Sequence, residues 1–122
     1  MDRETLKLYD HKDVGEVHIA DEVIAIIAGM AATEVEGVKG MVGKTADNFV
    51  ELLGRKNLSK GVAVEIIDGA VNLRLSLVVM YGSSIVEVSK NVSEKVKNAV
   101  ETMTGLDVAE VNINVTGVDI DH

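Results

Sequence analysis

The chain has 122 residues and a formal net charge of −8 at pH 7, with 47% hydrophobic and 26% charged residues. This length and balance predict one globular domain and exclude a disordered tail or a collagen-like repeat. Cysteine is absent, which excludes disulfide scaffolds and cysteine zinc sites. Only two tyrosines and one phenylalanine are present, too few for a surface that stacks on bases, which argues against a nucleic-acid partner.

The first third of the chain alternates strand and helix patterns. Residues 1–13 are charged and aperiodic, and we expect a flexible N-terminal lead-in there. Residues 15–19 alternate apolar and polar side chains, which predicts a strand. Asp21 is the expected N-cap of the helix that follows, and Gly37 is its expected stop. A short strand is expected over residues 38–42.

The best-specified segment is a β-hairpin around Asp68-Gly69. Alternating apolar residues flank this dipeptide, and a two-residue turn needs both of its residues at positive φ, which Asp and Gly tolerate. The turn pairs Val64 with Leu73 and sets apolar residues opposite each other. A slip of one residue would put Leu73 opposite Glu65, so the turn and the pattern predict the same register.

Two further helices and a last strand complete the predicted order. Residues 47–54 are typical of a two-turn helix. Ser84 and Glu87 form a capping box, and the helix that they open is expected to end at Gly105. Its predicted apolar stripe comprises Ile85, Val88, Val92, Val96, Ala99 and Met103. Residues 108–118 alternate as a closing strand.

The resulting order, β-α-β-α-β-β-α-β, predicts an α+β fold. We expect a two-layer single domain over residues 14–120, with one sheet and two main helices on one face of it. A ferredoxin-like arrangement agrees with this order, but the pattern leaves the order of strands in the sheet open.

The first main helix has one side almost without side-chain bulk. At 100° per residue, Ala25, Gly29 and Ala32 fall close together on it. Such a face lets another backbone approach closely, and two interpretations stay open. Either the face packs against the helix over residues 84–104, or it meets a second copy of the chain.

Gly37, Lys39 and Gly40 match the GxxG clamp of KH-type RNA-binding modules. In such a module a helix follows the second glycine, whereas residues 41–43 are a poor helix start. The acidic net charge also opposes RNA binding. The alternative is a helix stop followed by a strand that its glycines loosen.

The rest of the motif search is negative. The histidines, His11, His18 and His122, have no metal-ligand spacing with each other or with the carboxylates, so we predict no metal, cofactor or catalytic residue. No apolar run approaches the ~18 residues of a membrane span, and the N-terminus lacks the form of a signal peptide. These features predict a cytoplasmic protein that does not insert directly into a membrane.

Five short motifs, in this order, resemble the alkaline shock protein family and, within it, the short YloU-type branch. They are GEVHIADEVI at 15–24, GVKGM at 37–41, GV at 61–62, VMYG at 79–82 and VNINVTGV at 111–118. The resemblance implies a small, non-catalytic cytoplasmic protein of chiefly Gram-positive bacteria that works in the envelope stress response. It also implies self-association and recruitment to the inner face of the membrane by an anchor protein with a related domain.

Three hypotheses about function follow. The first is a non-catalytic scaffold or adaptor in cell-envelope homeostasis, which acts through self-association and protein contacts. The second is a regulator of fatty-acid or lipid metabolism that binds an enzyme or a small ligand, because some branches of the family are linked to that metabolism. The third is a KH-like RNA-binding module built on Gly37-Val38-Lys39-Gly40. The sequence does not separate the first two, and its acidic charge disfavours the third.

Overall fold

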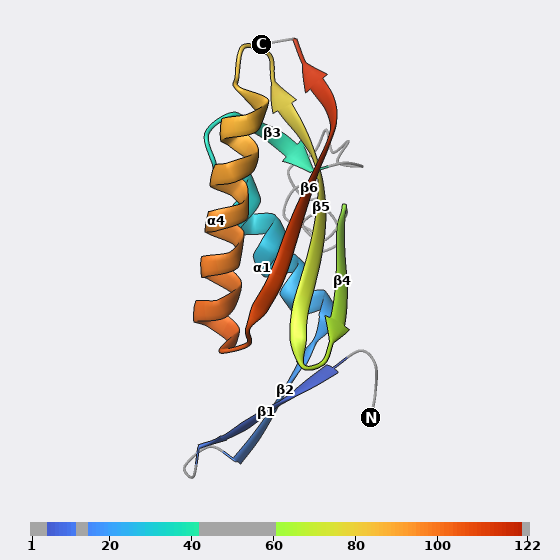
Figure 1. Ribbon diagram of the computed structural model, residues 1–122, viewed down its shortest axis with the longest axis vertical. Helices are drawn as coiled ribbons and strands as arrows, with labels where there is room; N and C mark the ends of the chain where they lie inside the picture. Colours follow the sequence, from blue (N-terminus) through green and yellow to red (C-terminus); the bar gives the residue numbers. More distant parts are fainter. Residues whose placement is uncertain (1–4, 12–14, 42–60, 121–122) are drawn as a thin grey trace, which may run out of the picture.

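The main sheet is organised around β5 (Ala70–Met80), in a computed structural model that describes residues 5–11, 15–41 and 61–120. β6 (Val108–Asp119) runs parallel to β5 along one side. β4 (Val62–Ile67) and β3 (Val38–Met41) both pair antiparallel with the other side, β4 with the first part of β5 and β3 with its last part. The result is a mixed four-stranded sheet in which β3 and β4 share one edge of β5 (Figure 1).

The predicted hairpin between β4 and β5 is confirmed in its register. Val64 pairs with Leu73, and the pairing continues to Ile67 opposite Ala70. Asp68 and Gly69 form the turn with φ values of 51° and 81°, as a two-residue turn with both central residues at positive φ requires.

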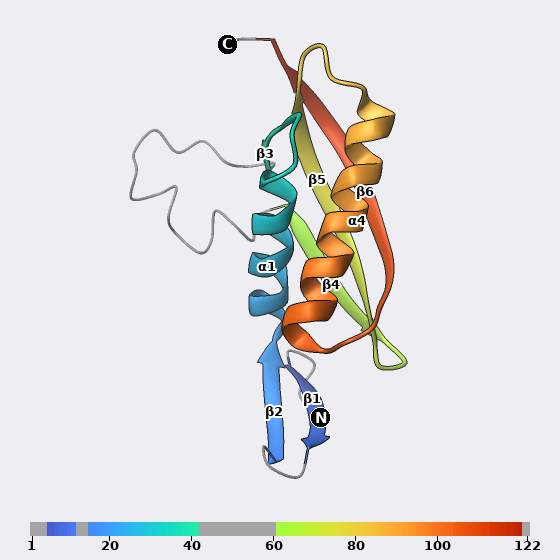
Figure 2. The same ribbon diagram turned by 90° about the vertical axis from the view of Figure 1, so that its left-hand side faces the viewer.

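Two long helices, α1 (Asp21–Thr33) and α4 (Ile85–Thr104), cover the same face of the sheet (Figure 2). The α+β class with two main helices on one face is therefore confirmed. Under the helices lie alternate residues of β5 with 0–2% exposure, namely Val71, Leu73, Leu75, Leu77 and Val79. Burying each of these side chains contributes roughly 1.5–3 kcal/mol. α4 also supplies the long crossover that joining two parallel strands requires.

α4 has the predicted ends, although its buried stripe differs from the predicted one. The Ser84 hydroxyl accepts a hydrogen bond from the Glu87 amide at 3.3 Å, and Gly105 ends the helix with φ 77°. The buried row is Val88, Val92, Val96, Val100 and Thr104. Ile85 and Met103, which we expected in this row, are 46% and 69% exposed. The residues of α4 that contact the sheet follow each other at intervals of four. Such a row shifts gradually around the helix axis, so Ile85 and Met103 fall outside it.

α1 begins one residue earlier than predicted. Its N-cap is Ala20, with extended backbone and no side-chain capping bond, and Asp21 is the first helical residue. A carboxylate in the first turn still favours the helix through the dipole. After Thr33 the chain turns through Gly37, with φ 99°, into β3.

The N-terminal segment differs from the expected flexible lead-in. β1 (Thr5–His11) pairs antiparallel with β2 (Gly15–Ala20) in a separate two-stranded sheet. β2 is the strand that we expected in the main sheet, and the hairpin extends away from it (Figure 1). Backbone pairing depends little on side-chain periodicity, so the charged residues of this segment hid the strand. The helix predicted at 47–54 lies outside the described residues.

Candidate interaction surfaces

The small-residue face of α1 lies inside the protein. Ala25 is 5% exposed, Ala32 is 0% exposed and Gly29 is buried. Ala25 borders a depression together with Val62 and Val64 of β4. This burial is what a packing role requires, and residues of β4 lie beside Ala25. A role for the face in self-association stays a prediction, which the substitution of Ala25 tests below.

α1 does pack beside α4, but through another side of the helix. Ile27 and Ala31 of α1 and Ala99 of α4 line a groove of about 210 Å³ between the two helices. Two exposed methionines, Met30 and Met103, also line it. The Lys95 ammonium lies 3.3 Å from the Glu34 carboxylate, and both residues border the same groove. The groove is therefore mainly apolar, with an ion pair at its rim.

The structure places the GxxG segment at the start of a strand. Gly37 precedes β3, and Gly40 is paired with Val78 of β5. Lys39 falls at the irregularity in this pairing, and its ammonium is 3.4 Å from the Asp119 carboxylate. A KH clamp needs a helix after its second glycine. Here a strand continues to Met41 and the lysine is paired with a carboxylate.

Gly37 itself is explained by packing. A Cβ atom on this residue would lie 2.6 Å from Cγ2 of Val88 and 3.1 Å from the Ser83 hydroxyl oxygen. Its φ of 99° also lies in the region that favours glycine. The turn after α1 thus sits directly against the start of α4, and a larger residue does not fit there without a shift.

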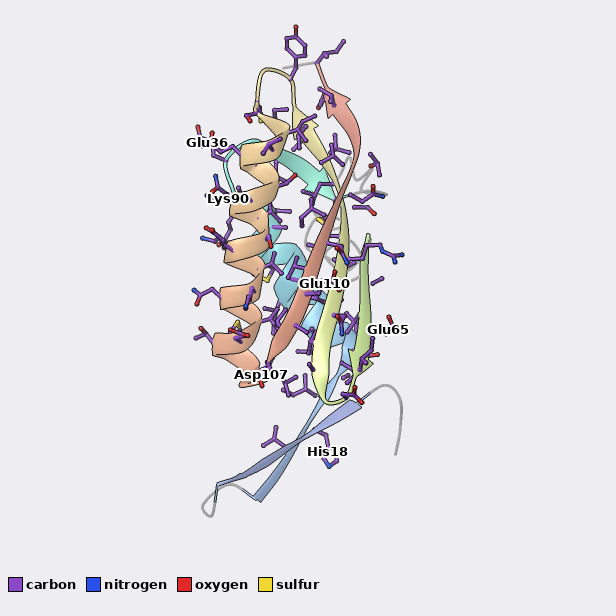
Figure 3. All side chains as sticks on the ribbon, in the orientation of Figure 1. His18, Glu36, Glu65, Lys90, Asp107 and Glu110 are labelled. Atoms are coloured by element: carbon purple, nitrogen blue, oxygen red, sulfur yellow. The ribbon has the colours of Figure 1, made fainter. Side chains whose placement is uncertain are left out.

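Metal chemistry finds no support among the residues that the structure describes. They contain no group of three or more histidines or carboxylates placed to hold a metal ion. His18 is exposed on the β1–β2 hairpin (Figure 3). The side chain of His11 and all of His122 lie outside the described part of the chain.

The face of the sheet opposite the helices is polar and open. A shallow depression of about 520 Å³ on it is bordered by Glu65, Arg74, Glu110 and Asn112 from three neighbouring strands. Glu65 and Glu110 are labelled on this face in Figure 3. Opposite charges are mixed here, as is usual for a solvated sheet face.

The ends of β5 and β6 and the start of α4 lie at the same end of the protein (Figure 1), and all three carry exposed apolar side chains. We call this set the apolar tip. It comprises Met80 (42% exposed), Tyr81 (75%), Ile85 (46%), Val86 (80%), Val118 (46%) and Ile120 (66%). The Tyr81 amide donates to the Asp119 carbonyl at 3.0 Å, which holds the two strand ends together. Several large exposed apolar side chains at one end of a soluble protein make that end a candidate contact site.

The sequence did not reveal the apolar tip. Ile85 fits the apolar stripe of its helix, so it looked like core, whereas alternation puts Val118 on the outward side with Asn112 and Asn114. Val86 was a usable signal, because it is a valine in the first turn that lies off the stripe.

Comparison with known proteins places the chain among bacterial stress proteins. The model of the alkaline shock protein 23 family, described by a cell envelope-related function, matches residues 9–120. The uncharacterized protein YqhY of Bacillus subtilis is 41% identical over 122 residues, covering 98% of this chain and 90% of YqhY. YloU of the same organism is 40% identical over 87% of this chain and 90% of its own length. A stress response regulator gls24 homolog of Streptococcus pyogenes is 30% identical over 85% of this chain, which spans 59% of that protein.

Solved structures show a related fold. A structure of the MamM CTD is similar, with a TM-score of 0.52 and 13% identity, over 82% of this chain and 100% of that one. A second MamM CTD structure has a TM-score of 0.51 and 14% identity. At this level of identity the similarity concerns the fold alone.

Proposed function

The chain belongs to the alkaline shock protein 23 family, and from this membership we propose that it is a non-catalytic scaffold or adaptor in cell-envelope homeostasis and the envelope stress response. It acts through self-association and through contacts with partner proteins. The envelope-related description of the family and the stress response regulator name of one relative support this role.

The apolar tip is the observation that carries the proposal. Six large apolar side chains, each at least 42% exposed, lie at one end of the protein. Covering them would remove apolar surface from water at about 25 cal/mol per Å². A partner protein that presents an apolar surface of its own therefore gains free energy by docking there.

We place this activity in the cytoplasm, at the inner face of the membrane. No helix in the described residues is long and apolar enough to cross a membrane. The protein reaches the membrane through an anchor protein that carries a related domain, without inserting itself.

The test is affinity purification from native cells, comparing the wild type with Val86→Glu. Val86 is 80% exposed, so the substitution alters the tip without burying a charge. Asn98→Glu is the matched control, because it adds the same charge at another exposed position of α4. We expect partners that are retained by the wild type and by Asn98→Glu and lost with Val86→Glu. The same proteins recovered with all three would contradict the role of the tip.

A second candidate function is regulation of lipid metabolism by binding an acyl ligand. The apolar groove between α1 and α4 favours it, since Lys95 at its rim could pair with a carboxylate. The groove volume of about 210 Å³ is below the ~300–1,000 Å³ typical of ligand pockets, which ranks this function second. Calorimetric titration with a medium-chain fatty acid tests it. Ala99→Phe, which fills the groove, should abolish the binding, and Asn98→Phe should leave it unchanged.

A further inference from the structure

One edge of β6 is unpaired among the residues that the structure describes. The strand pairs with β5 from Val108 to Asp119 and, within the described residues, with no strand on its other side (Figure 2). An unpaired edge presents a row of backbone amides and carbonyls to any strand that can align with it. Proteins usually protect such edges with lysine, proline or short strands. β6 has 12 residues and contains neither lysine nor proline.

The apolar side chains along this edge are incompletely covered. Val111, Ile113 and Val115 face the helices and contact the core, yet each is only half-buried. Their neighbours Leu73, Leu75 and Leu77 on β5 are at most 2% exposed. A further strand beside β6 would therefore cover apolar surface and satisfy backbone groups at the same time.

The sequence of the edge is self-complementary. Residues 111–115 read Val-Asn-Ile-Asn-Val in both directions. They lie between the two irregularities in the pairing with β5, so their own strand geometry is regular. Two copies related by a two-fold axis at Ile113 would pair valine with valine on the helix side. On the open side, Asn112 of one copy would lie opposite Asn114 of the other. No charged pair arises within these five residues, despite the net charge of −8 per copy.

We propose that β6 of one copy pairs antiparallel with β6 of a second copy about a two-fold axis at Ile113, so that one sheet runs through the dimer. This rests on the self-association in the proposed function and names its surface. Such an isologous contact uses the same patch twice. The other edge strand, β4, fits less well, because it has 6 residues and carries Glu65 in the middle of its pairing.

Cysteine pairing tests the register, because the chain has no cysteine of its own. In the proposed register the Cα atoms of Asn112 and of Asn114 in the other copy lie about 4.5–5.5 Å apart, within disulfide reach. The two Asn112 residues lie about 8 Å apart, which is beyond that reach. Mixing Asn112→Cys with Asn114→Cys under mild oxidation should give a linked dimer, whereas either variant alone should not.

Asn112→Cys mixed with Ala63→Cys is the control, since Ala63 is exposed on the opposite edge strand. A control mixture that cross-links as fast as the Asn112→Cys and Asn114→Cys mixture would overturn the proposed register.

Charge exchange tests the interface without oxidation. Asn112→Glu/Asn114→Glu creates two facing pairs of like charge in the dimer, and both residues are exposed in the monomer. We expect dimer affinity to fall about tenfold and to recover when this variant is mixed with Asn112→Lys/Asn114→Lys. Thermal unfolding of each variant should match the wild type within about 3 °C.

Sedimentation equilibrium separates the possible failures. A wild type that stays monomeric at every concentration would overturn both the self-association and the β6 interface. A wild type that self-associates, with charge variants that associate equally well, would overturn the β6 interface alone.

Discussion

Gly37 and Gly82 offer a matched pair for measuring how tightly the α1–β3 turn packs against α4. Their φ values are nearly equal, 99° and 96°. A Cβ on Gly82 would meet nothing within 4 Å, whereas one on Gly37 would lie 2.6 Å from Cγ2 of Val88. Gly82→Ala therefore reports the backbone cost alone, and Gly37→Ala adds the clash.

The two costs follow from the structure. An L-residue in the left-handed region costs about 1–2 kcal/mol, and the reduced entropy of the unfolded chain offsets about 0.4–1 kcal/mol. We therefore expect Gly82→Ala to lower the free energy of unfolding by about 0.5–1 kcal/mol. Val88 is 5% exposed and belongs to the core, so it has little room to move. Overpacking against it adds about 1–3 kcal/mol to the cost of Gly37→Ala.

Urea unfolding followed by far-UV circular dichroism measures both values, since the chain has no tryptophan to report by fluorescence. Val88→Ala completes a double-mutant cycle. Because it removes the Cγ2 atom, Gly37→Ala should cost less in the Val88→Ala background, by about 1 kcal/mol or more. Equal losses for Gly37→Ala and Gly82→Ala, or a cycle without coupling, would refute the close approach.

Three further predictions concern the small face, the hairpin and metals. Ala25→Glu should lower the free energy of unfolding by about 3–5 kcal/mol, because the carboxylate would be buried beside β4. If the variant instead stays folded but elutes as a smaller species in size-exclusion chromatography, the face serves self-association. Gly69→Val should cost about 2 kcal/mol or more in urea unfolding, because φ is 81° and a β-branched residue resists it; an unchanged midpoint would contradict this. EDTA and reductant should leave the melting temperature unchanged, and a drop of several degrees would reveal a ligand set that the sequence does not show.

Where neighbours in sequence are also neighbours in the fold, the sequence predicted the structure well. The β4–β5 register follows from two residues at positive φ and from alternation on either side, and it is confirmed pair by pair. The ends of α4 follow from Ser84 and Gly105, which act on the adjacent backbone. In each case the interacting groups are close along the chain, so local geometry sets the outcome.

The candidate surfaces were predicted less well. Ala25, Gly29 and Ala32 were identified as a face, but the pattern of one helix does not say which element covers it, and β4 lies at Ala25. The motif at Gly37 and Gly40 was recognised, while its place on a strand depends on Val78 and Val79 of β5. The apolar tip joins residues 80–86 to the end of β6, about thirty residues later in the chain, so apart from Val86 no local pattern marks it.

By itself the sequence determined the α+β class, the two long helices and the hairpin, because periodicity and turn residues record which side of each element is buried. Only the tertiary structure decided that β6 lies parallel to β5, that β3 and β4 share an edge, and that β1 pairs with β2. The first two of these choices join residues far apart in the chain, and all three are made through backbone hydrogen bonds, which are alike for every residue except proline. The side-chain pattern therefore does not record which strands meet, and only the structure shows that one edge of β6 has no partner among the described residues.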